Sequence, residues 1–297
     1  MRQQDTICDF STSDSWVILS PIEQSIKRKI EAVGTPLKDW DIQINYGIKT
    51  GCNEAFIIST EKRKEILDNC QTEDERKRTA ELIRPILRGR DIKRYGYVDN
   101  GLFLINTHNG IRNKLPRIDI NDYPAVKTHL DQYWDRISTR ADKGDTPYNL
   151  RNCAYLEDFS KPKVVYMEIQ TENPEEGYPF PCYSYDDNRC IVLNTAYIMS
   201  SETTDPRYVL GILNSRLGKF LVKLYVIQLQ ERQFRMLSQY VMNFPIAHPT
   251  KEQENEMIHL VQDVLVHQSL ASEKRIDNLA FQIYGLTEIE IKSLISR

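Results

Sequence analysis

Apolar residues recur every three or four positions in several stretches of the chain, and this period predicts helices. The first predicted helix follows Ser20 and stops before Gly34, because Ser20 and Glu23 form a capping box and Pro21 suits the first helical position. A second capping box at Thr287 begins the last helix. The other predicted helices lie at residues 61–68, 73–83, 124–137 and 206–221, and further ones follow residue 249.

Alternating apolar and polar residues, or short apolar runs, predict strands instead. Such segments lie at residues 42–46, 55–58, 102–105 and 164–167. Residues 147–185 are rich in proline, asparagine and aromatic residues, so we expect long loops there. Strands interspersed with helices, followed by helices alone, predict an α+β or mixed α/β fold with an all-helical C-terminal tail.

The composition agrees with a folded chain of this kind. Of the 297 residues, 40% are hydrophobic and 27% are charged, which allows a sizeable core and argues against global disorder. No apolar run reaches the ~20 residues that span a bilayer, no leader opens the chain, and the six cysteines form no CxxC pair. We therefore expect a cytoplasmic protein with free thiols. Its expected parts are a loose N-terminus (1–15), a body (16–249) and a helical tail (250–297).

Charge is distributed unevenly along this chain, whose net charge is −3. An acidic balance by itself weakens a nucleic-acid interpretation, because proteins that bind DNA usually carry a basic surplus. Residues 207–235, however, contain six cations and one anion. A locally basic face on an acidic chain remains compatible with DNA.

Several catalytic signatures are missing from the sequence. It contains no GxGxxG or Walker-type loop, no HExxH helix and no GxSxG elbow, and its five histidines do not cluster at metal-ligand spacing. An adenine methyltransferase needs an Asn/Asp-Pro-Pro-aromatic motif to hold the flipped base, whereas Asn173-Pro174 is followed by two glutamates. We therefore expect the chain to be non-catalytic, with no cofactor and no metal of its own.

Two alternatives stay open. Asp91 and Lys93 supply a DxK pair with Asp74 upstream, as in metal-dependent nucleases of the PD-(D/E)xK type. Asp74 falls in a predicted helix rather than at the end of a strand, and charged residues often produce such matches by chance. The other alternative is an interaction domain that docks on a partner other than DNA through the apolar stripes of its helical tail.

The most basic short segment, residues 84–94, has five cations and one anion. It interrupts an apolar pattern instead of lying on a helix face, which favours contact with DNA over a solvated charge run. Arginine forks bind phosphate or guanine in two places, and glycine allows a close approach of the backbone. The candidate DNA contacts in this segment are Arg88, Gly89, Arg90, Lys93 and Arg94.

Three more polar stretches supply candidates. Residues 49–53 offer an ammonium, a hydroxyl and an amide, although their spacing alone favours an ordinary turn. In residues 140–151 a tyrosine either stacks on an exposed base or packs under a loop. Around residues 228–235, glutamine and arginine suit both base edges and an exposed helix face. The candidates are Lys49, Thr50, Asn53, Arg140, Tyr148, Arg232 and Arg235.

Taken together, several segments resemble the C-terminal specificity domain of TaqI-like adenine methyltransferases and related single-chain restriction–modification enzymes. The segments are, in order, residues 46–56, 86–92, 162–166, 213–217 and 276–287. The first two are the specific ones. The resemblance extends from about Trp16 to the last residues of the chain.

This resemblance implies a target-recognition module for double-stranded DNA. Such domains form one wall of a DNA cleft and present the target adenine to a methyltransferase domain, which uses S-adenosylmethionine. Some relatives also carry a nuclease domain, whose cleavage would need Mg²⁺. The resemblance implies DNA contact at Lys49, Thr50, Asn53, Arg88, Gly89 and Arg90. Because the catalytic domain is absent, we expect either a fragment of a larger enzyme or a separate specificity subunit.

Overall fold

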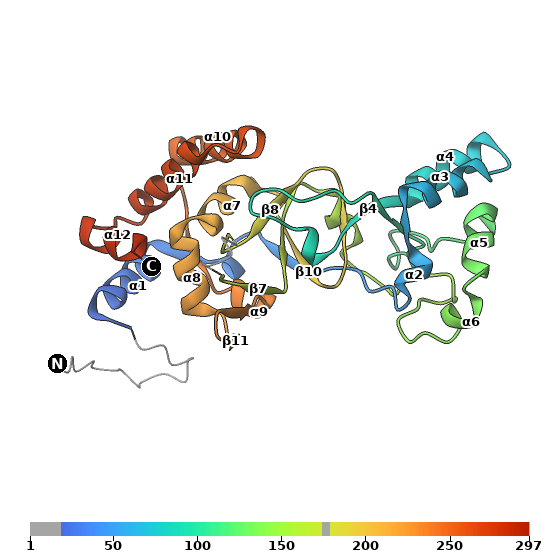
Figure 1. The fold of residues 1–297 in the computed structure, drawn as a ribbon, viewed down its shortest axis with the longest axis horizontal. Helices are drawn as coiled ribbons and strands as arrows, with labels where there is room; N and C mark the ends of the chain where they lie inside the picture. The colour runs from blue at the N-terminus through green and yellow to red at the C-terminus, as the bar shows by residue number, and fades with distance from the viewer. Residues whose placement is uncertain (1–18, 174–178, 297) are drawn as a thin grey trace.

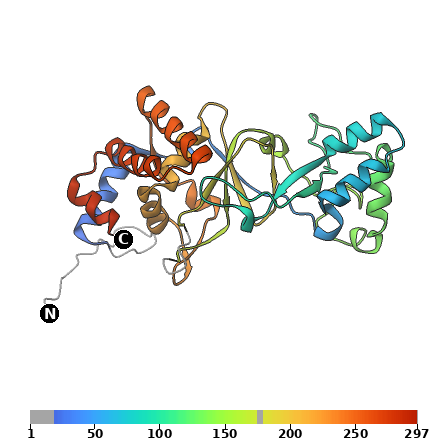
Figure 2. The same ribbon diagram turned by 45° about the horizontal axis from the view of Figure 1, so that its top comes forward.

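The computed structural model describes residues 19–173 and 179–296. The expected loose terminus, residues 1–15, lies outside this part. The described chain is elongated and has two lobes, one at each end of Figure 1, with a sheet between them. The C-terminal helices and α1 share the left-hand lobe, whereas α3 to α6 lie in the right-hand lobe (Figures 1 and 2).

Helices occupy both lobes. The α-helices are α1 (Pro21–Val33), α2 (Asn53–Phe56), α3 (Thr60–Asp68), α4 (Glu73–Leu82), α5 (Pro124–Asp131), α6 (Trp134–Ile137), α7 (Pro206–Asn214), α8 (Arg216–Tyr225), α9 (Ser238–Val241), α10 (Lys251–His267), α11 (Leu270–Ile283) and α12 (Glu288–Ile295). Short 3₁₀ turns are η1 (Leu37–Asp39), η2 (Gly89–Asp91), η3 (Ile120–Asp122) and η4 (Leu156–Ser160). The predicted capping boxes at Ser20 and Thr287 are both formed.

The strands are short and form small sheets. They are β1 (Gly34–Pro36), β2 (Gln43–Tyr46), β3 (Ile57–Ser59), β4 (Ile83–Leu87), β5 (Leu102–Ile105), β6 (Lys163–Met167), β7 (Ile169–Thr171), β8 (Tyr183–Asp186), β9 (Ile191–Val192), β10 (Ala196–Ser200), β11 (Gln228–Gln230), β12 (Gln233–Arg235) and β13 (Pro245–Ala247). The sheet orders are β2-β10-β6-β8, β3-β5-β4-β9, β11-β12-β7 and β1-β13. All pairs are antiparallel except β4 with β9.

The central sheet, β2-β10-β6-β8, separates two hydrophobic cores. Successive residues of a strand point to opposite faces, so each strand serves both cores. Val165 pairs with Ile198, and both belong to the core of the right-hand lobe. Tyr166 pairs with Tyr197, and both belong to the core of the left-hand lobe. The two lobes are therefore built on opposite faces of one sheet.

The tail is helical, as predicted, and it shares the left-hand core with the body. Met257 and Val261 of α10, and Ile276 of α11, are fully buried in the same cluster as Leu210 and Leu213 of α7. The mixed fold with an all-helical C-terminal tail is thus confirmed.

Some predicted elements were wrong in detail. Ala55 and Phe56 lie in the helical turn α2 rather than in a strand, because both side chains are fully buried in the same core and a strand would point one of them outward. The predicted helix 206–221 is split at Ser215, whose hydroxyl caps α8 by accepting from Gly218 N–H. Residues 124–137 likewise form two short helices. Besides loops and the predicted strand β6, residues 147–185 contain β7 and most of β8, which were not predicted.

Glu290 fixes the last helix to the first. Its carboxylate accepts hydrogen bonds from Lys29 Nζ at 2.7 Å and from Ser25 Oγ at 2.8 Å, both on α1. It also accepts from Thr287 N–H at 2.7 Å. Burial raises the pKa of Glu290, but the hydrogen bonds from Lys29, Thr287 and Ser25 outweigh it and lower the pKa to about 2.

We expect acid to weaken this attachment. An unperturbed glutamate has a pKa of about 4.3, so the lowered pKa stabilises the fold above that pH, and this stability is lost as the pH falls toward about 2. Glu290→Gln should lower the free energy of unfolding at pH 7 by about 1 kcal/mol and flatten the acid dependence. Thermal unfolding between pH 2 and pH 7 checks both. Glu288→Gln, at an exposed position of α12, is the control, and an unchanged acid slope in Glu290→Gln would contradict the assignment.

Candidate nucleic-acid interface

Residues 192–196, which join β9 to β10, hold the two motif loops together, and we call this segment the clasp. On one side of the clasp lies the first loop, residues 47–53. On the other side lies the basic turn, residues 88–94. Two motifs that are distant in the sequence are therefore neighbours in the structure.

Main-chain hydrogen bonds fasten the clasp on both sides. Ile48 N–H donates to the carbonyl of Val192 at 2.8 Å, and the carbonyl of Ile48 accepts from Asn194 N–H at 3.1 Å. On the opposite side, Leu193 N–H donates to the carbonyl of Leu87 at 2.8 Å. Because backbone groups make these contacts, the two loops are held in a fixed relation without any side chain taking part.

The glycines of both motifs allow the backbone to approach the clasp. A Cβ on Gly47 would lie 2.2 Å from the carbonyl oxygen of Leu193, and one on Gly89 would lie 2.8 Å from that of Thr195. Gly89 N–H also donates to Thr195 Oγ1 at 2.9 Å. Gly89 was expected to let the backbone approach a phosphate, but the structure shows it buried and packed against the protein's own backbone.

In the basic turn, Arg88 is bound to Asp91. Its Nε and Nη2 donate to the two carboxylate oxygens at 2.9 and 2.8 Å, and its backbone N–H adds a third bond at 2.8 Å. Burial raises the pKa of Asp91, but the bonds from Arg88 outweigh it and the pKa is lowered. Arg90 is exposed and makes no salt bridge within the described part of the chain. The arrangement thus fixes the turn through Arg88 and presents Arg90 outward.

The next two cations of the turn have different surroundings. Lys93 is exposed, and its Nζ donates to the carbonyl of Arg90 at 3.0 Å. Arg94 was expected to contact DNA, but its Nε and Nη2 bind Glu273 of α11 at 3.1 and 2.7 Å, and its Nη1 donates to the carbonyl of Asn214. In this structure Arg94 attaches the tail to the body.

The first loop uses its polar groups differently from the expectation. Thr50 is 1% exposed, and its hydroxyl donates to Asn53 Oδ1 at 2.6 Å while accepting from Cys52 N–H. These bonds lie in the turn that leads into α2, so in this structure Thr50 shapes the loop from inside. Asn53 itself is exposed. Lys49 is also exposed and lies 3.9 Å from a carboxylate oxygen of Asp142.

Arg140 lies inside the protein, although we expected it at the surface. Its guanidinium donates to the carbonyls of Thr50, Asp142, Pro147 and Asn149. The residue is 7% exposed, and burial lowers its pKa to about 10. Arg140 therefore joins the first loop to the loop of residues 142–149 and does not face solvent.

Tyr148 is partly covered, which favours the second of its two interpretations, a tyrosine that packs under a loop. Its hydroxyl donates to Asp131 at 2.5 Å, its ring lies 5.5 Å from that of Trp134, and Lys127 Nζ lies 5.4 Å from the ring centre. These contacts join the loop before Tyr148 to α5 and α6.

The last two candidates lie on the hairpin β11–β12. Arg235 Nε donates to Glu168 at 2.9 Å, and Glu168 N–H donates to the carbonyl of Thr195 at 3.0 Å. Arg235 is therefore linked to the clasp. Arg232 lies in the turn of the hairpin, where its Nε is 3.9 Å from Oε1 of Glu231.

A comparison with known families gives the decisive observation. Residues 84–246, more than half of the chain, match the family described as the TaqI-like C-terminal specificity domain. The chain belongs to this family. The match includes the basic turn and the clasp, and it ends in β13.

Curated relatives of this specificity domain are type II methyltransferases. M.BstVI of Geobacillus stearothermophilus is 23% identical over 292 residues, covering 95% of this chain and 46% of the relative. M.BanIII of Aneurinibacillus aneurinilyticus is 21% identical over 265 residues, covering 83% and 42%. M.PaeR7I of Pseudomonas aeruginosa is 20% identical over 288 residues, covering 95% and 45%. The chain thus spans less than half the length of these relatives.

Two solved structures have a similar fold. One is the type IIL restriction–modification enzyme MmeI in complex with DNA, with a TM-score of 0.59 and 14% identity over 89% of this chain and 37% of that one. The other is the type IIG restriction endonuclease BpuSI, with a TM-score of 0.51 and 13% identity over 90% of this chain and 34% of that one. At these identities the likeness is one of fold.

The residues proposed for a nuclease find no support in the specificity domain. The carboxylate of Asp91 is bound by Arg88 and also accepts from Asn100 Nδ2 at 3.0 Å. Asp74 lies in the first turn of α4, in the right-hand lobe. Among residues 19–173 and 179–296, no three His, Cys, Asp or Glu side chains are grouped so as to hold a metal ion.

Within the same ranges, no helix combines the length and apolar character needed to cross a bilayer.

Sequence reasoning missed the clasp. It begins inside a short buried run, Ile191 to Leu193, and its turn residues Asn194 and Thr195 carry no charge that would draw attention. The only sequence signal was the pair of motif glycines, since a glycine marks a close backbone contact without naming its partner.

Proposed function

We propose that this specificity domain is the target-recognition part of a restriction–modification adenine methyltransferase and that it recognises a short sequence in duplex DNA. The observation that carries the proposal is the convergence of the first loop and the basic turn on the clasp. There the exposed cations Lys49, Arg90 and Lys93 belong to loops whose relation is fixed by backbone bonds. The backbone that carries these cations is therefore already in place, and contacts from lysine and arginine to phosphate can set the register of the domain on DNA.

The distribution of ion pairs supports a division of roles within the basic turn. Arg88 neutralises Asp91, which would otherwise repel phosphate, and it thereby keeps the turn closed. Arg90, next to it, makes no salt bridge within the described residues and is free to meet phosphate oxygens. Phosphate contacts supply affinity and position, whereas base contacts supply specificity.

The proposed partner is a methyltransferase catalytic domain, in the same parent chain or as a separate subunit. That domain would bind S-adenosylmethionine, and Mg²⁺ would be needed if the parent enzyme also cleaves DNA. The curated relatives support this, because they are type II methyltransferases of which this chain matches less than half.

Arg90→Ala should weaken binding to a mixed-sequence duplex by about 5-fold at low salt, because one phosphate contact is lost. The slope of log K against log salt should become less steep by about 0.9. Fluorescence anisotropy titrations at several salt concentrations measure both quantities. Arg28→Ala is the matched control, since Arg28 is an exposed arginine of α1 that also makes no salt bridge within the described residues.

Two results would count against this proposal. One is that the wild-type chain binds no duplex at low salt. The other is that Arg28→Ala weakens binding as much as Arg90→Ala does. The second result would mean that net charge, and not the basic turn, determines the affinity.

A further inference from the structure

The hairpin β11–β12 projects from the lower edge of the molecule in Figure 1, beyond α8. From Ile227 to Arg235 the side chains are exposed, except for the buried Phe234 and the half-buried Gln233. Such a run of exposed residues contributes almost nothing to either core. These residues nevertheless form a two-stranded ribbon, with a register shift between Gln228 and Gln230, so a role of the ribbon is to be sought at the surface.

The base of the hairpin is rigid. Strand β12 pairs with β7, where Phe234 stands opposite Gln170. Gln170 is fully buried and bonds both backbone groups of Cys182, at 3.1 and 2.8 Å. Phe234 is 4% exposed, and its ring lies 5.3 Å from that of Phe180. A ribbon anchored in this way can hold its tip in place without support from solvent-exposed contacts.

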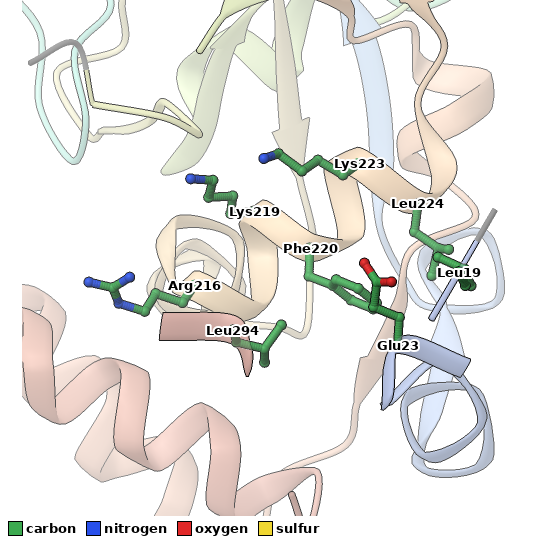
Figure 3. Close-up of a pocket in the computed structure, with 8 residues that line it drawn as sticks. All are labelled: Leu19, Glu23, Arg216, Lys219, Phe220, Lys223, Leu224 and Leu294. Carbon is green, nitrogen blue, oxygen red and sulfur yellow. The ribbon is translucent and has the colours of Figure 1, made fainter. Parts of the chain in front are cut away.

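Two lysines of α8 lie beside the hairpin. Lys219 and Lys223 bind the carboxylate of Glu172 at 2.5 and 2.8 Å, and Glu172 N–H donates to the carbonyl of Arg232 at 2.8 Å. Both lysines line a small pocket together with Phe220 of the same helix, and Figure 3 shows their ammonium ends directed away from the Phe220 ring. The two lysines share one carboxylate, so this flank of the hairpin keeps one net positive charge, which suits a position close to phosphates.

The tip carries recognition groups that the fold does not use. Within the described residues, the side chains of Gln228 and Gln230 make no hydrogen bond to the protein, and Arg232 has only its distant ion pair with Glu231. Glutamine can bind an adenine edge in two places, and arginine a guanine edge. Leu229 is 45% exposed on the same strand, and an apolar side chain can contact a thymine methyl group.

We propose that this hairpin is a base-reading ribbon that enters the major groove, with Gln230 and Arg232 recognising base edges. The major groove, about 12 Å wide, admits a two-stranded ribbon. The inference rests on the proposed function and adds to it which residues choose the bases. Arg90 and the clasp then supply affinity, and the hairpin supplies specificity.

The test is selection of preferred sites from a randomised duplex library by the 297-residue chain and its variants. Gln230→Ala and Arg232→Gly should each relax the preference at one base pair, lowering the ratio of preferred to substituted base by about 5- to 150-fold. Glycine suits position 232 because Arg232 has a φ of 64°, in the left-handed region. Arg232→Asn, which also tolerates this backbone, is the second variant. Circular dichroism verifies folding.

Arg90→Ala is the matched comparison in this experiment. It should weaken binding to all sequences alike and leave the base preference unchanged, as expected for a phosphate contact. If the hairpin variants select the same sites as the wild-type chain, the base-reading ribbon is overturned, and the proposed function still stands. A wild-type chain that binds duplexes without any preference would overturn both. If the hairpin variants change the oligomeric state and leave the base preference unchanged, the exposed edge strand β11 makes contacts with protein, and the base-reading ribbon is overturned.

Discussion

Lys163→Met should lower the free energy of unfolding by about 3–5 kcal/mol, the range found when one partner of a buried ion pair is removed. Lys163 and Asp186 are both 0% exposed, and their side chains bind each other between β6 and β8. Lys163 Nζ also donates to the carbonyl of Phe159 at 2.8 Å. Methionine has a similar length but no charge, so the carboxylate of Asp186 would stay buried without its counterion.

The damage should extend to the clasp. Asp186 accepts from the backbone N–H groups of Asn188 at 3.1 Å and Cys190 at 3.0 Å, and from Tyr97 Oη at 3.1 Å. These bonds hold the chain that leads directly into β9 and the clasp. An unpaired carboxylate that moves toward water would pull this segment with it, so DNA binding should weaken together with stability.

Urea unfolding curves measure this effect. Lys114→Met is the control, because Lys114 forms an exposed ion pair with Glu157 and such pairs contribute about 0–1 kcal/mol. The double variant Lys163→Met/Asp186→Asn should recover part of the loss, since the buried charge is then removed with its partner. If Lys163→Met cost no more than Lys114→Met, the buried pair would not have the role assigned to it.

Gly47→Ala should also destabilise the domain, by about 1–3 kcal/mol or more, through overpacking. The added Cβ would lie 2.2 Å from the carbonyl oxygen of Leu193 and 2.4 Å from that of Val192. Both are backbone atoms, so no side chain can rotate away to make room. The first loop and the clasp would have to separate, which should break the bond between Gly47 N–H and the carbonyl of Ala196.

Gly96→Ala provides a matched control for Gly47→Ala. A Cβ on Gly96 would meet no atom within 4 Å, so the same substitution should leave stability nearly unchanged. Thermal unfolding and anisotropy titration on both variants compare stability with DNA binding. Equal melting temperatures for the two variants would show that the first loop does not need its close contact with the clasp.

The sequence by itself determined the elements whose signals are local. The capping boxes at Ser20 and Thr287 depend on residues three positions apart, and both helices begin where they predict. The strand β6 and the helical tail also follow from residues within one element, since the periodicity of apolar positions depends only on neighbours along the chain. The mixed fold class followed from the order of these elements.

The split of the helix at Ser215 and the turn at Ala55 escaped prediction, because they depend on which core receives each side chain. Long-range packing also decides which candidate DNA contacts stay exposed and which are bound inside the protein. Arg90 and Arg94 are both arginines of one basic turn, yet only Arg94 meets a carboxylate of α11, Glu273, some 180 residues later in the chain.

Arg140 and the clasp show most clearly what only the tertiary structure decided. Arg140 appears in the sequence as one more surface cation, but its guanidinium binds carbonyls from two loops that approach each other only in the folded chain. The clasp has no charged residue and no motif, and it matters because two distant loops bond to its backbone. A sequence shows which donors and acceptors a protein has. Which of them are paired inside, and which remain for DNA, is fixed by long-range packing.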